Sequence, residues 1–356
     1  MPSRFGLPAS CLLLLLLAPL GAAALQYGDV LVVDQLNNRI LRVDPNNGSV
    51  TEFTAGNLLS LPQSIAVDPD TGEIVVLQAN DPQLVSIDPA TRHQFAVGQS
   101  LLLGAQPTGL TMSPRAPSIF SSRVLFVSCA GSLFEVDRPF FGSASTTNLS
   151  AYPSPNESAV GNFVAARDPG GPNPLDIFVA TSAKILLYTS SPMTEYWTLP
   201  QTTLQGLGYD PLDQYGNGDR LFFSYQYVSC PSDFNGVFYF DLRNGLTPPQ
   251  AGFGDVSVIQ TGGNLACPGS IALSDLATGS LAGAPFPIYV VDVGSIPPRI
   301  VEVTEPGVNH VAATLPEGSN ATGLAVYTPE PHADSLELVA GSALLVLRRR
   351  RSSGVH

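Results

Sequence analysis

Amide and carboxylate side chains recur next to short apolar runs along the sequence. Two of them, Asp34 and Asn80, stand just after such a run, and five amides stand just before one. Amides donate and accept hydrogen bonds, so a group of them could bind a neutral polar ligand such as a saccharide. The alternative, which we favour, is that they cap strand ends and bind water. The five amides are Gln63, Gln106, Asn162, Gln205 and Asn320.

The residue patterns of common catalytic sites are missing from the sequence. His93 and His310 are the only histidines outside the two ends, and both stand in runs expected to form outer strands. There is no Gly-x-Ser-x-Gly elbow, phosphate loop or Cys-x-x-Cys pair. The segment from Asp68 to Gly72 resembles a calcium loop faintly but lacks the further oxygen ligands and the terminal glutamate. We therefore assign no catalytic residue, resident metal or cofactor.

Three cysteines follow the first 24 residues. Cys230 comes after an apolar run and Cys267 precedes another, and both positions are expected on the same face of neighbouring repeat units. We predict a disulfide between them, which leaves Cys129 as the odd cysteine.

The charge balance argues against nucleic-acid binding. The formal net charge is −13 and Lys184 is the single lysine, so no basic surface attracts a phosphate backbone. With 44% hydrophobic and 13% charged residues, the composition is that of a folded chain. The 33 glycines and 32 prolines indicate many turns between short strands.

A repeat of short β-branched runs and turns fills the middle of the chain. Asp-Pro, Asn-Gly and Thr-Gly turns separate the runs, and the period is that of four-stranded propeller blades. The second strands of six units are expected to begin at Val30, Ile74, Val124, Ile177, Leu221 and Ile288, and five first strands fall around Ile65, Gly109, Phe163, Gly206 and Ser270.

The first unit lacks a first strand, and the missing strand stands at the far end of the repeat. Residues 321–326 match residues 107–112, so we expect the C-terminal strand to complete the N-terminal blade and close the ring. The fold predicted is all-β, a six-bladed propeller over residues 25–328, with five or seven blades as alternatives. The Asp-Pro turns should share one face, with each aspartate bonding its own turn. These aspartates are Asp44, Asp68, Asp88, Asp168 and Asp210.

The segment Asp34-Gln35-Leu36-Asn37-Asn38-Arg39-Ile40 resembles the strand-turn-strand signature of NHL repeats. Propellers of the NHL-like and gluconolactonase-like families bind ligands on the face where second strands end, and the resemblance therefore places the seven polar residues above on that face. Gluconolactonase-like propellers also hold a divalent metal there, with a first-strand glutamate at its centre. No first strand of this chain begins with glutamate, so the sequence departs from that motif.

The N-terminal residues 1–24 have the pattern of a secretory signal peptide. Arg4 precedes an apolar core, and the run of small residues at 21–24 provides a cleavage site.

The C-terminal residues 329–356 resemble a sorting signal. Pro329-Glu330-Pro331, a short apolar segment expected to be a helix, and the cluster Arg348, Arg349, Arg350 and Arg351 follow one another. Thirteen residues, 335–347, separate Asp334 from the arginines, fewer than the roughly 20 that span a bilayer. The order resembles the PEP-CTERM signal of Gram-negative bacteria. That resemblance implies an exosortase-type processing enzyme as partner, transient membrane contact through the helix, and export to the envelope or beyond, often with exopolysaccharide.

Two functions follow from these features. The one we favour is an exported binding or scaffold module of the envelope or extracellular matrix, with polysaccharide or envelope proteins as partners. The alternative is a metal-dependent hydrolase or lyase, gluconolactonase-like, with its site and a divalent metal in the central channel. Whether the protein is an enzyme stays open at this point, with the balance against it.

Overall fold

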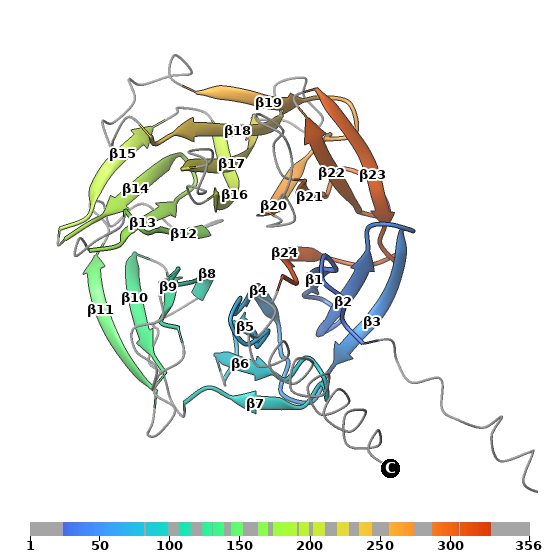
Figure 1. The fold of residues 1–356 in the computed structure, drawn as a ribbon, viewed down its shortest axis with the longest axis horizontal. Coiled ribbons are helices and arrows are strands. Elements are labelled where there is room, and N and C mark those ends of the chain that lie inside the picture. The colour runs from blue at the N-terminus through green and yellow to red at the C-terminus, as the bar shows by residue number, and fades with distance from the viewer. Residues whose placement is uncertain are drawn as a thin grey trace, which may run out of the picture.

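The described part of the chain is built from strands. The computed structural model describes residues 24–81, 83–98, 107–114, 123–129, 131–138, 144–151, 163–169, 174–190, 192–198, 202–210, 219–227, 235–243, 256–273, 287–305 and 307–328. These residues form 24 strands in six four-stranded antiparallel sheets, and no helix occurs among them. The sheets surround one axis (Figure 1).

Each sheet is one blade, with its strands in order from the innermost outwards. Blade I has β24 (Ala321–Val326), β1 (Val30–Asp34), β2 (Arg39–Asp44) and β3 (Ser49–Ala55); blade II has β4 (Pro62–Val67), β5 (Ile74–Gln78), β6 (Leu84–Ile87) and β7 (Gln94–Ala96). Blade III has β8 (Pro107–Met112), β9 (Leu125–Cys129), β10 (Ser132–Asp137) and β11 (Ser145–Ala151); blade IV has β12 (Phe163–Arg167), β13 (Asp176–Ala180), β14 (Lys184–Tyr188) and β15 (Thr194–Thr198). Blade V has β16 (Thr202–Asp210), β17 (Arg220–Tyr227), β18 (Gly236–Asp241) and β19 (Ser257–Thr261); blade VI has β20 (Pro268–Leu273), β21 (Ile288–Asp292), β22 (Arg299–Glu305) and β23 (Val308–Thr314).

The ring closes through the two ends of the repeat. Strand β24 pairs antiparallel with β1, with Val30 opposite Val326 and Val32 opposite Leu324. The predicted closure and the predicted six blades are therefore confirmed. The six innermost strands, β4, β8, β12, β16, β20 and β24, lie around the centre of the ring (Figure 1).

The second strands of the blades are deeply buried elements. In blades I, II and VI these strands begin at the predicted residues, and in the others at Leu125, Asp176 and Arg220, one residue from the prediction. Strands β1, β5, β9, β13 and β21 are buried along their whole length, because blades pack against both sides of them.

The ring has two faces, which we name by the direction of the innermost strands. The entry face is where these strands begin, and it carries the β1–β2 and β21–β22 turns. The exit face is where they end, and it carries the Asp-Pro turns after β2, β4 and β6. For three of the five predicted aspartates, the bond to their own turn is confirmed: Asp44 accepts from the amide of Asn46, Asp68 from Asp70, and Asp88 from Ala90 and Thr91.

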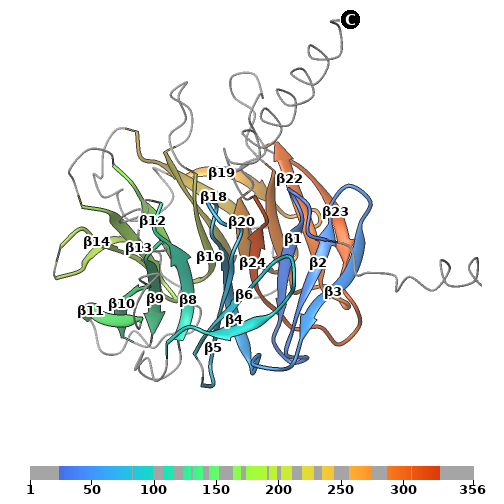
Figure 2. The same ribbon diagram turned by 60° about the horizontal axis from the view of Figure 1, so that its bottom comes forward.

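Both described ends of the chain lie together at the exit face. The amide of Gly28 donates to the carbonyl of Tyr327 at 2.8 Å, and the amide of Tyr327 donates to the carbonyl of Asp29 at 2.8 Å. The first strand of the chain therefore begins, and the last strand ends, at this face; Figure 2 shows the ring turned by 60° from the view of Figure 1.

The core lies between the blades, where the sides of neighbouring sheets meet. Between blades I and II it is mostly aliphatic, with Leu31, Val33, Ile65 and Ile74 in one cluster with a single aromatic residue, Phe53. Between blades IV and V it is aromatic, and its members include Phe178, Tyr196, Trp197, Phe223 and Phe240. The ring thus repeats one topology with two kinds of packing.

Residues 1–23 of the predicted signal peptide and the whole predicted sorting signal, residues 329–356, lie outside the described residues. Within the residues that are described, no helix is long and apolar enough to cross a membrane.

Candidate functional site

The Asp34 carboxylate is bound on both oxygens at the entry face. Its Oδ1 accepts from the amide of Asn320 at 2.9 Å, its Oδ2 from Arg39 Nε at 2.8 Å, and both from Asn37 Nδ2. Burial raises the pKa of Asp34, but the hydrogen bonds from Asn320, Arg39 and Asn37 outweigh it and hold this pKa below its ordinary value. Asp34 and Asn320, two of the predicted ligand residues, are thus brought together, and they bond each other.

Blade VI repeats this arrangement. Asp292 lies opposite Arg299 in the strand register, as Asp34 lies opposite Arg39. Its Oδ1 accepts from the amides of Cys267 and Gly294, and its Oδ2 accepts from Arg299 Nη2 at 2.7 Å. Each carboxylate ties the turn after a second strand to the segment before a first strand. The motif that resembles NHL repeats therefore has a structural role in both blades.

A second group of polar residues lies near the beginning of the innermost strands, at the entry face. In blades I, II, III and V the register of the innermost strand shifts by one residue near this point, and the extra residues are Thr322, Gln63, Thr108 and Gln205. Such bulges re-aim a side chain out of the regular alternation. Gln63 Oε1 and Thr108 Oγ1 are buried and have no hydrogen-bond partner among the described residues.

Aligning the bulges shows that the predicted amides belong to different positions. Gln63 and Gln205 occupy bulges, whereas Asn320 lies two residues before the bulge at Thr322. Asn80 is on an exposed turn, where its Nδ2 donates to Ser60 Oγ at 2.7 Å. Gln106 and Asn162 lie outside the described residues.

Sequence reasoning missed Thr108 and Asp292. Thr108-Gly109-Leu110 matches Gln63-Ser64-Ile65, and this alignment would have selected Thr108 rather than Gln106. Asp292 was hidden because its turn to Arg299 is two residues longer than the turn between Asp34 and Arg39.

A cavity of about 430 Å³ occupies the central channel towards the exit face. All six innermost strands line it with residues from their later halves, and Pro69, Pro114 and Thr328 surround its exit. Most of the lining residues have apolar or small side chains. The charged lining residue is Arg123, which donates from Nε and Nη2 to the Asp70 carboxylate at 2.8 Å each. Asp70 belongs to the segment from Asp68 to Gly72 that resembled a calcium loop, and Arg123 pairs with its carboxylate.

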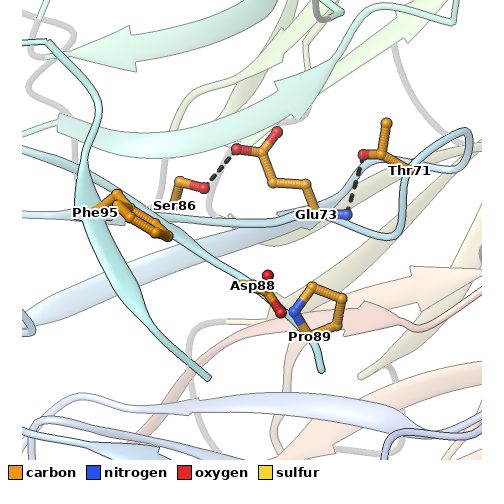
Figure 3. A pocket seen from close by; sticks show the side chains of 6 residues that line it. All are labelled: Thr71, Glu73, Ser86, Asp88, Pro89 and Phe95. Carbon is orange, nitrogen blue, oxygen red and sulfur yellow. Dashed lines mark hydrogen bonds between the residues drawn. The ribbon is translucent and has the colours of Figure 1, made fainter. Parts of the chain in front are cut away.

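A second hollow, of about 480 Å³, lies on blade II and is lined by Thr71, Glu73, Ser86, Asp88, Pro89 and Phe95 (Figure 3). Its polar groups bond to one another: Ser86 Oγ donates to Glu73 Oε1, and the amide of Glu73 donates to Thr71 Oγ1. Glu73 Oε2 also accepts from Arg138 Nη1 of blade III at 2.9 Å. The hollow therefore lies beside a contact that joins blades II and III.

His310 stands on the outer strand β23, as predicted, whereas His93 directly precedes the outer strand β7. His310 Nε2 lies 3.5 Å from Glu302 Oε2, and the His93 ring contacts the Phe95 ring. Among the described residues, no three His, Cys, Asp or Glu side chains gather as a metal site would require.

The cysteines fall into two states. Cys129 is free and buried, and burial raises the pKa of its thiol to about 12. Cys267 is disulfide-bonded. Cys230 lies outside the described residues, so the pairing of Cys267 with Cys230 stays a prediction.

Comparisons with known proteins find similar folds. Neither a protein-family model nor a curated protein matches the sequence. A chain of the nidogen–laminin complex has 10% identity, covers 85% of this chain and 99% of its own length, and gives a TM-score of 0.56. A gluconolactonase from Xanthomonas campestris has 12% identity, with 74% and 78% covered and a TM-score of 0.49. The PQQ-bound aldose sugar dehydrogenase from Streptomyces coelicolor has 14% identity, with 86% and 92% covered and a TM-score of 0.47. At these identities the likeness concerns the fold alone.

Proposed function

We propose that the chain is an exported binding or scaffold module of the cell envelope or extracellular matrix. A group of exposed apolar side chains on the entry face carries this proposal. Ile296 is 94% exposed, Leu36 66%, Val293 43% and Leu61 40%. An apolar group of this kind on a folded surface is typical of a site that contacts another protein.

Hydrogen bonds join the turns that bear these side chains. The amide of Leu61 donates to Asn38 Oδ1 at 2.7 Å, which links blade II to the β1–β2 turn. Asn37 Nδ2 donates to the carbonyl of Gly318 at 3.3 Å. The amide of Leu315 in the same connection donates to the carbonyl of Pro298, in the turn that bears Ile296. The apolar side chains of blades VI, I and II therefore stand on one connected set of turns.

The position of the chain ends agrees with a binding role for the entry face. The segment predicted to carry the sorting signal follows Thr328 at the exit face. A tether at the exit face would direct the entry face away from the membrane. The apolar entry-face group would then meet envelope or matrix proteins, while the exosortase-type enzyme would act at the opposite side.

The alternative, a metal-dependent hydrolase or lyase, draws on the buried oxygens of Gln63 and Thr108. Divalent cations prefer carboxylate ligands, and these two oxygens are neutral. The carboxylates of Asp34 and Asp292 on this face already accept hydrogen bonds on both oxygens. The described residues therefore fit a divalent metal poorly, and a stoichiometric metal found in the purified protein would favour this alternative.

Expression of the full chain in a Gram-negative host, with and without an exosortase, tests the sorting proposal. We expect export, and a cut near residues 329–331 only when the exosortase is present, measured by mass spectrometry of cell fractions. A full-length chain that stays in the cytoplasm in both hosts would contradict it.

The binding surface has its own test. Ile296→Asp together with Leu36→Asp should release the exported chain from the envelope or matrix fraction under a mild wash, because a charge replaces each exposed apolar contact. Phe95→Asp is the matched control, since Phe95 is 51% exposed on the outer strand β7. Equal retention of the double variant and the control would count against the entry face.

A further inference from the structure

We propose that the cavity in the central channel binds a neutral, hydroxyl-rich ligand of the size of a short oligosaccharide. This inference rests on the binding function proposed above and names a ligand class for it. It also places the ligand in the half of the channel nearer the exit face, away from the entry-face amides that the sequence suggested.

Unpaired strand edges supply the hydrogen bonds. Each innermost strand is an edge strand of its sheet, so its inner edge has no strand neighbour in the described sheets. Such an edge presents alternating N–H donors and C=O acceptors. Six of these edges converge on the cavity, and residues of all six strands line it. Hydroxyl groups can both donate and accept, so a polyhydroxylated ligand matches a wall of mixed donors and acceptors.

The polar side chains on the wall are neutral or already paired. Arg123 donates to Asp70 and to the carbonyls of Ser113 and Pro114, so its charge is compensated. The hydroxyl of Tyr209 donates to Asp219 Oδ1 at 3.0 Å, and burial together with that carboxylate raises the pKa of Tyr209. The chain as a whole is strongly acidic, so its field repels anions. These charges favour a neutral sugar over a uronic acid.

The size and the apolar part of the wall fit the same ligand class. A volume of about 430 Å³ lies within the range of about 300–1,000 Å³ typical of small-molecule sites. Small residues such as Ala66, Ala166 and Gly208 leave this space open, and Leu110 and Met112 offer apolar contact to the C–H faces of a sugar ring. A purely apolar ligand would leave the strand edges unpaired, which disfavours it.

Titration of the purified full chain with defined probes tests the ligand class. The probes are maltose, cellobiose, glucuronic acid and toluene. Binding of each is measured by saturation-transfer NMR and calorimetry. We expect at least one of the neutral disaccharides to bind at one site, and glucuronic acid and toluene to bind at least tenfold more weakly. Failure of both disaccharides to bind, or a preference for glucuronic acid or toluene, overturns the proposal.

Two substitutions in the wall test the location. Met112→Trp should fill the cavity and abolish disaccharide binding. Thr111→Val keeps the shape of the side chain but removes its hydroxyl, and should weaken binding about three- to tenfold. Val258→Trp on the outer strand β19, where this side chain is 54% exposed, and Thr51→Val on the exposed side of β3 are the matched controls, and both should bind as the parent chain does.

A thermal melt of each variant separates loss of binding from loss of fold. If Met112→Trp does not fold, the isosteric Thr111→Val decides the question. Unchanged disaccharide affinity in a folded Met112→Trp chain, or in Thr111→Val when Met112→Trp fails to fold, overturns the location. Export, processing and envelope retention are measured independently, so a chain that is sorted and retained but binds no sugar overturns this inference alone.

Discussion

Blade I and blade V have the same strand order but are held together in different ways. In blade I the buried strands are aliphatic, and the Asp34 carboxylate fixes the turn between them through Arg39. In blade V the strands are rich in aromatic residues, and the rings of Phe223 and Phe240 lie 5.2 Å apart. Trp197 of blade IV lies 5.2 Å from both of these rings. Blade I is held by a carboxylate–arginine pair at its turn, and blade V is held by the packing of aromatic side chains.

The origin of the strands also differs. Blade V is one continuous stretch of sequence, whereas blade I combines β24 with β1–β3, which stand some 270 residues apart in the chain. Two blades that differ in both respects still share one strand order, so the alternation of buried runs sets that order. The turn signature strengthens particular blades, and the closing strand completes the ring.

Removal of β24 should have the largest effect. A chain that ends at Asn320 leaves β1 with an open inner edge and exposes the Leu324 side of the core. We expect no cooperative unfolding transition, and aggregation in size-exclusion chromatography. A chain that ends at Thr328 keeps β24 and should melt as the full chain does. If the chain ending at Asn320 also melts cooperatively as a monomer, the ring does not need its closing strand.

Trp197→Ala should lower the free energy of unfolding by about 3–5 kcal/mol, because removal of the large buried indole leaves a cavity between blades IV and V. Trp197 is 2% exposed. Urea denaturation with constant m-value measures the change. Phe95→Ala removes an exposed ring from blade II and should change stability by less than about 0.5 kcal/mol. Equal effects of the two substitutions would show that the aromatic cluster is not a stabilising element.

Opening the disulfide of Cys267 should cost about 2–4 kcal/mol and affect the blade V–VI side alone. Cys267→Ser removes the bridge, whereas Cys129→Ser replaces the free buried thiol in blade III and serves as the comparison. In a chain that has lost residues 1–24, thiol titration under denaturing, non-reducing conditions should find one free group. Three free groups would refute the predicted pairing with Cys230.

Two glycines of strand β16, separated by one residue, allow a matched pair of substitutions. A Cβ on Gly206 would lie 2.8 Å from the backbone nitrogen of Ile271, and one on Gly208 would lie 3.2 Å or more from the flexible side chain of Leu273. Gly206→Ala should therefore cost about 1–3 kcal/mol, and Gly208→Ala distinctly less. Thermal melting measures both. The reverse order would mean that blades V and VI lie further apart near Gly206 than near Gly208.

Sequence reasoning recovered the strands because burial leaves a strong signal. Val30, Ile74 and Ile288 were each predicted as strand starts and are observed as such, since each of these three strands begins with four apolar residues. The errors of one residue at Leu125 and Asp176 fall at strand ends, where polar flanking residues make the boundary indistinct.

The candidate site was less predictable because it depends on register. A bulge at Thr108 shifts the alternation of side chains along β8, and a strand pattern with period two does not reveal it. The role of Asp34 required the partner segment at Asn320, which is distant in sequence. The cavity itself is made by six separate strands, so only the closed ring defines it.

The Asp34 network should contribute the smallest effect, and one that depends on pH. Asp34→Asn keeps an acceptor for the amide of Asn320 but loses the charged bond to Arg39, which should cost about 1 kcal/mol at pH 7. Because the pKa of Asp34 is lowered in the folded chain, its contribution is present above the unfolded pKa and is lost as pH falls through the folded value. Urea melts of the parent and variant should therefore converge below about pH 4. Asp44→Asn, in an exit-face turn without an arginine partner among the described residues, is the control. A difference between Asp34→Asn and the parent that persists at pH 2 would show that the charge is not what holds the blade I turn.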